Sequence, residues 1–200
     1  MTKYADDTSL LVPEMNTVSL EEEFNHLQVW AQTNKLVINM LKTKEIVFHL
    51  PNPGGVVMPP PLTNIERVKF AKLLGVYIVD NLGAGKQIDF LLKTRKRQLY
   101  LLNQIKKQGL AKQQLLCVFD AIITSRITYA AAWSGFAIIA EQNAMQAFRN
   151  KVKRWGIISD DRSIDDILDE IDYGLFKQMQ FSNHYLHHIL PNESHSVHGM

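Results

Sequence analysis

Five of the seven prolines in this 200-residue chain stand between positions 51 and 61, together with Gly54 and Gly55. Proline fixes the backbone angle φ and lacks an amide donor, so neither a helix nor a central strand can run through such a segment. The sequence therefore predicts a loop here. The loop separates an N-terminal part with strand-like segments from a helical C-terminal part.

The part before the prolines combines short apolar runs with one helical pattern. Residues 10–12 (LLV) follow the polar residues Asp6 and Asp7, which predicts a strand, a turn and a second strand. A helix is expected after Ser19, because Ser19 and Glu22 fit a capping box and apolar residues then recur at helical spacing. Further strands are predicted over 36–38, 46–48, 68–70 and 73–78.

The part beyond Gly85 follows a helical period. Gly156 is expected to end the third of its long apolar stripes. The predicted fold class is therefore α+β, with strands at the front and helices behind. The predicted helices cover 88–105, 115–123, 144–155, 164–171 and 175–180, and the tail after Pro191 is expected to be unstructured.

Composition excludes several classes of protein. Hydrophobic residues make up 46% and charged residues 21% of the chain, which is ordinary for a folded domain and excludes wholesale disorder. Cys117 is the single cysteine and excludes an intramolecular disulfide; its apolar neighbours predict a core position. The uncharged run over 127–140 is shorter than the roughly 20 residues that cross a bilayer, and the first residues lack the apolar core of a signal peptide. We expect an intracellular protein with no membrane partner.

Charge is segregated within the helical part. Residues 86–112 contain eight basic side chains and one acid, whereas residues 159–172 contain seven acids and one arginine. We therefore expect one basic face and one acidic face.

Two adjacent carboxylates stand in Tyr4-Ala5-Asp6-Asp7, between two strand-like segments. Like charges repel and resist burial, so the tip of a hairpin is the place that tolerates them. Taken alone, such a pair is most often a surface turn. A divalent cation gives it a second use, because Mg²⁺ binds one or two carboxylates together with substrate phosphates.

Residues 3–12 (KYADDTSLLV) resemble the Tyr-x-Asp-Asp box of reverse transcriptases, in the class of the non-LTR, LINE-type (jockey-like) retrotransposons. The likeness continues in order along the chain. Asn39 with residues 42–45 (KTKE) resembles the next palm motif, and residues 72–78 (KLLGVYI) resemble the hairpin that grips the primer. The basic helical segment that follows resembles the thumb.

The resemblance implies a partial palm over 1–81, a thumb-like region over 82–156, and an acidic helical extension with a flexible tail over 157–200. The intact enzyme would be an RNA-directed DNA polymerase. Its partners would be an RNA template, a DNA primer and deoxynucleoside triphosphates, and its cofactor Mg²⁺ or Mn²⁺.

By the same resemblance, Asp6 is a metal ligand and Asp7 its assisting carboxylate. Lys42 is the expected proton donor to pyrophosphate, although a lysine in a polar turn is more often simply solvated. The residues expected near the primer are Tyr4, Ala5, Leu74, Gly75 and Val76.

The basic cluster Lys93, Arg95, Lys96 and Arg97 suits phosphate backbones, and a solvated helix face explains it equally well. Trp155 is a candidate stacking platform for bases, but its spacing from Phe148 favours core packing.

The chain departs from the reverse transcriptase pattern at its front, where only three residues precede Tyr4. The fingers and the earlier palm strand with a further metal-binding aspartate do not fit there, so we expect this chain alone to be inactive. Three alternatives stay open. One is a catalytically dead remnant that binds nucleic acid, and another is a helical protein-interaction module that uses the acidic face over 159–172. The third is a translated pseudogene product without a role.

Overall fold

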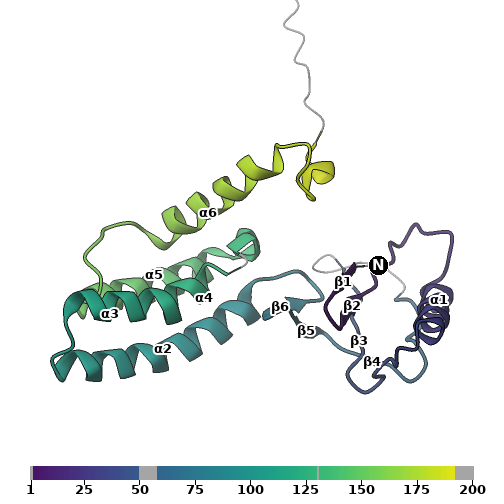
Figure 1. Ribbon diagram of the computed structural model, residues 1–200, viewed down its shortest axis with the longest axis horizontal. Coiled ribbons are helices and arrows are strands. Elements are labelled where there is room, and N and C mark those ends of the chain that lie inside the picture. The colour runs from purple at the N-terminus through teal and green to yellow at the C-terminus, as the bar shows by residue number, and fades with distance from the viewer. Residues whose placement is uncertain (1, 50–57, 130, 192–200) are drawn as a thin grey trace, which may run out of the picture. The chain divides into compact units, whose positions relative to one another are not determined.

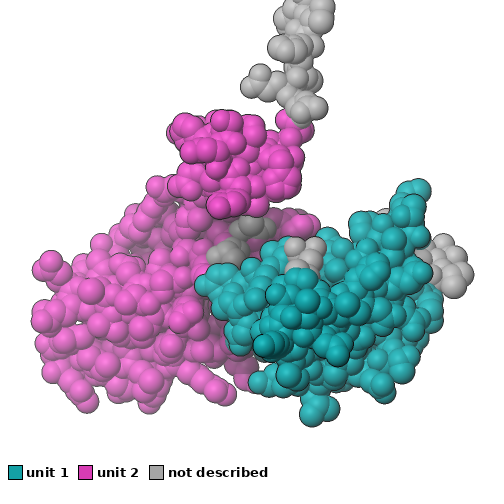
Figure 2. Space-filling view, turned by 45° about the vertical axis from the view of Figure 1, so that its right-hand side comes forward, with its two compact units in different colours: residues 1–82 teal, residues 83–200 magenta. Residues whose placement is uncertain are grey.

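The computed structural model describes residues 2–49, 58–129 and 131–191. The chain divides into two compact units, Met1–Leu82 and Gly83–Met200, which Figure 2 shows in different colours. The described strands all lie in the first unit and most of the helical residues in the second, so the predicted α+β class is confirmed (Figure 1).

The described strands of the first unit form three separate two-stranded sheets. Sheets of this size are marginal in water without further packing. Among the described residues of this unit, the buried apolar side chains are those of Phe24, Ala31 and Ile65. The sheets are β1 (Thr2–Tyr4) with β2 (Asp7–Ser9), antiparallel; β3 (Lys44–Glu45) with β4 (Glu66–Arg67), parallel; and β5 (Phe70–Leu73) with β6 (Val76–Val79), antiparallel.

Helix α1 (Leu20–Thr33) begins with the predicted capping box. The amide of Glu22 donates to Ser19 Oγ at 3.2 Å, and the amide of Ser19 donates to Glu22 Oε2 at 2.9 Å. The bonds that the Glu22 carboxylate accepts from the amide and the hydroxyl of Ser19 hold its pKa below its ordinary value. The amides of Ser19 and Glu22 are two of the free amides at a helix start, and their bonds fix where α1 begins.

Three of the predicted strands are wrong in position. Residues 36–38 and 46–48 have no regular structure, and β2 ends at Ser9, before residues 10–12. The chain turns at Asn39, whose carbonyl accepts a bond from the amide of Thr43 at 2.9 Å. Val37 is 95% exposed, so residues 36–38 lack the packing that stabilises a strand. The predicted pair at 68–70 and 73–78 exists in a shifted form, because the turn falls at Leu74 and Gly75.

The second unit is a packed set of helices. Helix α3 (Lys112–Phe119) continues through a π-helical turn, Asp120–Thr124, into α4 (Ser125–Ile127), and a 3₁₀ segment, Ala131–Phe136, follows before α5 (Ile139–Arg154). In the described part of the chain, no helix is long and apolar enough to span a membrane. The α-helices are α2 (Gly85–Lys107), α3 (Lys112–Phe119), α4 (Ser125–Ile127), α5 (Ile139–Arg154) and α6 (Ile164–Met179), and a 3₁₀ turn covers His187–Ile189.

The three predicted long stripes face one apolar core. Gly156 takes a φ of +66° and ends α5, as predicted, and Lys106 Nζ donates to the carbonyl of Trp155 beside it. Trp155 packs partly buried against the core, with Lys151 Nζ 4.8 Å from its ring centroid. The largest fully buried side chains are those of Ile88, Leu99, Leu102, Leu115, Ile123, Val152 and Ile157.

Two expectations about the helices are wrong. The segment expected as two short helices is the single helix α6, because Gly174 is accommodated inside it. Cys117 is exposed, because Leu115 and Phe119 stand four residues apart and turn their side of α3 to the core. The expected unstructured tail after Pro191 and most of the proline-rich loop lie outside the described residues.

Candidate functional site

The Tyr-x-Asp-Asp box forms the tip of the β1–β2 hairpin. Tyr4 and Asp7 are paired residues, and Ala5 and Asp6 make the connection between the strands. Successive side chains in a strand point to opposite faces. Lys3 Nζ lies 5.6 Å from the ring centroid of Trp30 on α1, so Tyr4 and Asp7 belong to the face turned away from that contact. The structure thus gathers the four expected residues at one exposed tip.

The tip also has an unusual backbone. Ala5 has a φ of +52°, in the left-handed region that residues with a Cβ rarely adopt. A glycine would relieve this strain at no steric cost. Asp6 and Asp7 are both exposed, so nothing in the described residues covers the two carboxylates.

Two exposed carboxylates fit part of a magnesium site. Mg²⁺ keeps several waters and is commonly held by one or two protein carboxylates plus phosphate oxygens of a substrate. Asp6 and Asp7 supply that number of carboxylates. Over residues 2–49, 58–129 and 131–191, no group of three histidine, cysteine, aspartate or glutamate side chains is placed to hold a metal ion. The tip therefore fits a cation that a substrate helps to bind.

The residues expected to support the primer lie at a second hairpin tip. Leu73 pairs with Val76, and Leu74 and Gly75 form the two-residue connection with φ values of +47° and +93°. Two positive φ angles are typical of the type I′ turn, whose twist matches that of the flanking strands. Neither β5 nor β6 pairs with β1 or β2, so the two hairpin tips belong to separate sheets.

Lys42 lies in the turn after α1, as expected from its polar surroundings. Its amide donates to Asn39 Oδ1 at 3.1 Å, and Thr43 Oγ1 donates to the carbonyl of Asn39 at 2.9 Å. Asn39 therefore shapes the turn that carries Lys42. In the part of the chain that the structure describes, no hydrogen bond joins the Lys42 side chain to either hairpin tip, and its catalytic role stays a prediction.

A buried ion pair next to this turn, between Glu45 and Arg67, was not predicted from the sequence. Arg67 Nη2 donates to Glu45 Oε1 at 2.6 Å, and the Glu45 side chain is 5% exposed. The amide of Leu62 donates to the second oxygen of Glu45 at 3.2 Å, and Arg67 also donates to the carbonyls of Pro59 and Pro60. These bonds connect β3, β4 and the end of the proline-rich loop. Only the position of Glu45 beside the apolar residues 46–48 signalled its burial.

The basic cluster on α2 divides in two. Lys93, Lys96 and Arg97 are exposed and form a basic row on the outer side of the helix. Arg95 is only 7% exposed and donates from Nη1 to Gln98 Oε1 at 2.5 Å and to the carbonyl of Ile122 at 2.6 Å. The expectation that Arg95 belongs to the phosphate-binding cluster is wrong, because its place on the helix turns it inward to the core.

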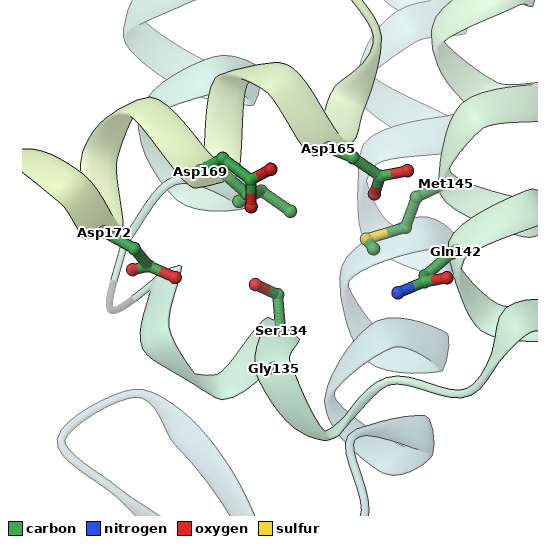
Figure 3. A pocket seen from close by; sticks show the side chains of 8 residues that line it. Ser134, Gly135, Gln142, Met145, Asp165, Asp169 and Asp172 are labelled. Atoms are coloured by element: carbon green, nitrogen blue, oxygen red, sulfur yellow. The ribbon is translucent and has the colours of Figure 1, made fainter.

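The acidic segment supplies a further feature, a hollow of about 320 Å³ beside α6. Figure 3 shows the carboxylates of Asp165, Asp169 and Asp172 along one side of it. Burial raises the pKa of Asp172, and the neighbouring Asp169 adds to the effect. The other lining residues are Ser134, Gly135, Gln142, Met145 and Leu168.

Comparison with known proteins adds no family. No protein-family model, curated protein or solved structure matches this chain.

Proposed function

We propose that this chain is the late palm and thumb of an RNA-directed DNA polymerase, a reverse transcriptase of the non-LTR, LINE-type class. The observation that carries the proposal is the β1–β2 tip. It presents the adjacent carboxylates of Asp6 and Asp7, both exposed, within a sequence that resembles the Tyr-x-Asp-Asp box. An ordinary surface turn does not require two adjacent carboxylates, whereas a cation site uses both of them. Nor does it require an alanine with a positive φ, and backbone strain of this kind is concentrated at functional sites.

Asp6 and Asp7 would hold Mg²⁺ together with phosphate oxygens of the incoming nucleotide. When bound, the ion supplies Lewis-acid stabilisation of the charge that develops in nucleotidyl transfer. Tyr4 pairs with Asp7 in the strand register, so its ring stands at the same tip, where the 3′ end of a primer has to lie for the reaction. The carboxylates orient the reacting groups and Tyr4 contacts the primer terminus.

The second hairpin supports the primer backbone. Leu74 is 42% exposed, and the two-residue turn brings the backbone of Gly75 to the surface of the tip. A glycine permits a nucleic-acid backbone to approach closely, because it has no Cβ. An exposed leucine held at a positive φ is costly for stability alone, which favours a contact at this position.

The basic row of α2 contacts phosphates of the nucleic acid. Lys93, Lys96 and Arg97 lie within five residues, so they present three positive charges on little more than one helical turn. Contacts of this kind are independent of base sequence and weaken as salt displaces them. The role excludes Arg95, whose donors are engaged inside the protein.

The experiment that tests the proposal places a photoreactive benzoylphenylalanine at position 4 or 74 of the whole chain. Each protein is irradiated with a labelled DNA primer annealed to an RNA template, in Mg²⁺. We expect crosslinks from both positions to concentrate within the last few nucleotides at the primer 3′ end. The matched control carries the same group at exposed Glu14, which lies on neither tip.

Crosslinks spread evenly along the duplex, or equal yield from position 14, would overturn the polymerase assignment. Primer extension by the isolated chain that Asp6→Asn abolishes would instead show that two carboxylates suffice for catalysis. It would contradict the expectation that this chain is inactive alone.

A second candidate function is nucleic-acid binding without chemistry, which the exposed basic row of α2 favours. Here the triple variant of Lys93, Lys96 and Arg97 to alanine should weaken binding and lower the salt dependence of log K by about 2 to 3, at about 0.7 to 0.9 per lost phosphate contact. The control triple variant of Lys69, Lys112 and Arg154 removes the same charges at exposed positions elsewhere. This candidate is favoured if position 4 gives no primer-end crosslink while the salt dependence falls as stated.

A further inference from the structure

Among the described residues, the side chains that α6 buries lie in its first half, and no apolar side chain of its second half is buried. Ile164 and Leu168 are buried, at 5% and 3% exposed, and α6 contacts α5 and the 3₁₀ segment Ala131–Phe136. Farther along the same stripe, Ile171 is 37% and Leu175 is 36% exposed, and Phe176 beside them is 45% exposed. Figure 1 shows the helix diverging from α5 toward its C-terminal end. An apolar stripe that continues past its own packing partner is typical of a docking surface.

A row of acids runs along one edge of this stripe. Asp165, Asp169 and Asp172 are spaced by four and three residues, so they stand above one another on the helix, and Phe176 continues the row. None of the three carboxylates has a cationic partner among the described residues. Two other acids of α6 are engaged, since Asp166 bonds to Ser163 at the helix start and Glu170 pairs with Arg162.

The acidic row borders the hollow shown in Figure 3. Met145 and Leu168 line it with apolar groups, both nearly fully buried, while the three carboxylates supply negative charge. A lysine or arginine side chain combines an aliphatic stem with a cationic end, and it buries the stem while the charge stays near water or a carboxylate. The lining of the hollow matches both parts of such a side chain.

We propose that this face of α6 docks a basic amphipathic helix of a partner protein. Apolar side chains of the partner, at three- and four-residue spacing, pack on Ile171, Leu175 and Phe176. Its lysines or arginines pair with the acidic row, and one enters the hollow. Charge complementarity selects this occupant, because unpaired carboxylates attract a basic helix and repel the phosphates of nucleic acids. The proposal is independent of the polymerase assignment, since it uses neither hairpin tip and no residue of α2.

The test uses the whole chain and a fluorescein-labelled synthetic helix of leucine and lysine, with leucines on one face and lysines flanking them. We expect saturable binding by fluorescence anisotropy. The triple variant Asp165→Asn, Asp169→Asn, Asp172→Asn should lower the affinity at least about tenfold, and so should the double variant Ile171→Ser, Phe176→Ser. A control triple variant, Glu14→Gln, Glu21→Gln, Glu23→Gln, removes three acids of the first unit and should bind as well as the wild type.

Three further measurements keep the result decisive. A peptide of the same composition with its leucines scattered around the helix should bind at least about tenfold more weakly. Equal binding of both peptides would mean that general charge attraction explains the binding, and it would overturn the proposal. Sedimentation velocity of the free chain should show a monomer. Self-association that Ile171→Ser, Phe176→Ser abolishes would assign the face to a second copy instead. Circular dichroism of each variant confirms that α6 is still folded.

Discussion

The guanidinium of Arg95 donates from Nη1 to the carbonyl oxygen of Ile122, 2.6 Å away and 27 residues later in the chain. Ile122 lies in the π-helical turn between α3 and α4, where the regular hydrogen-bond pattern of a helix is interrupted. Arg95 supplies a donor to this turn from the neighbouring helix α2. Burial lowers the pKa of Arg95, and the nearby Arg126 lowers it further. The charged guanidinium is therefore stabilised in this buried position by the hydrogen bonds that it donates.

Arg95→Ala should destabilise the second unit by about 2–3 kcal/mol, because it leaves a buried carbonyl without its charged donor and opens a cavity. The measurement is urea denaturation followed by circular dichroism at 222 nm. Lys96→Ala, on the exposed side of the same turn of α2, is the control and should change stability by less than about 0.5 kcal/mol. Equal effects of the two substitutions would show that the inward placement of Arg95 contributes nothing.

Leu74→Asn should stabilise the β5–β6 hairpin by about 1 kcal/mol. Leu74 has a φ of +47°, a conformation that is costly for leucine and readily adopted by asparagine, and Asn-Gly is the preferred pair for a type I′ turn. Hydrogen exchange of the amides over residues 70–79 should slow about fivefold, the factor that corresponds to this free energy. Faster exchange in the variant would mean that packing of the leucine outweighs its backbone strain.

Glu45→Gln should loosen the contact between β3, β4 and the end of the proline-rich loop. The substitution removes the negative partner of Arg67 and weakens the bonds that the Glu45 carboxylate accepts from Arg67 and from the amide of Leu62, at a cost of roughly 2 kcal/mol. Glu66→Gln is the matched control, because the Lys44–Glu66 pair is more exposed and such pairs contribute little. Hydrogen exchange over residues 62–68 distinguishes the two variants, and a larger effect of Glu66→Gln would contradict the assignment.

Ser163→Ala should cost about 1 kcal/mol at neutral pH through loss of the cap of α6. In the folded chain, Asp166 accepts from the amide of Ser163 at 2.8 Å, and its own amide donates to Ser163 Oγ at 3.0 Å. The bonds that the Asp166 carboxylate accepts from the amide and the hydroxyl of Ser163 lower its pKa below the ordinary 3.8. A lowered pKa stabilises the fold above the unfolded value, and the contribution is lost as pH falls through the folded value.

Asp166→Asn should therefore differ most from the wild type near pH 7, and the difference should shrink as the pH falls below about 4. Thermal melts between pH 7 and pH 2 measure it. A difference that stays constant over this range would show that the charge of Asp166 is not the stabilising feature. Asp165→Asn, one residue earlier and outside the capping box, is the control.

Features with a local cause were predicted well from the sequence. The capping box of Ser19 and Glu22, the hairpin around Asp6 and the end of α5 at Gly156 depend on residues at most a few positions apart. Hydrogen bonds and φ preferences at that range are properties of the residue types themselves. The tip of the β1–β2 hairpin belongs to this group, whereas the turn of the β5–β6 hairpin falls at Leu74 and Gly75, inside the strand predicted over 73–78.

What the sequence by itself determined is the order of helices and turns and the exposed pair Asp6 and Asp7. Only the tertiary structure decided that Val37 finds no partner strand, that Arg95 turns inward while Lys96 stays in solvent, and that Glu45 meets Arg67. It also decided that the side chains buried by α6 lie in its first half. These outcomes depend on contacts between segments far apart in the chain, and the burial of a side chain is fixed by what packs against it rather than by its neighbours in sequence.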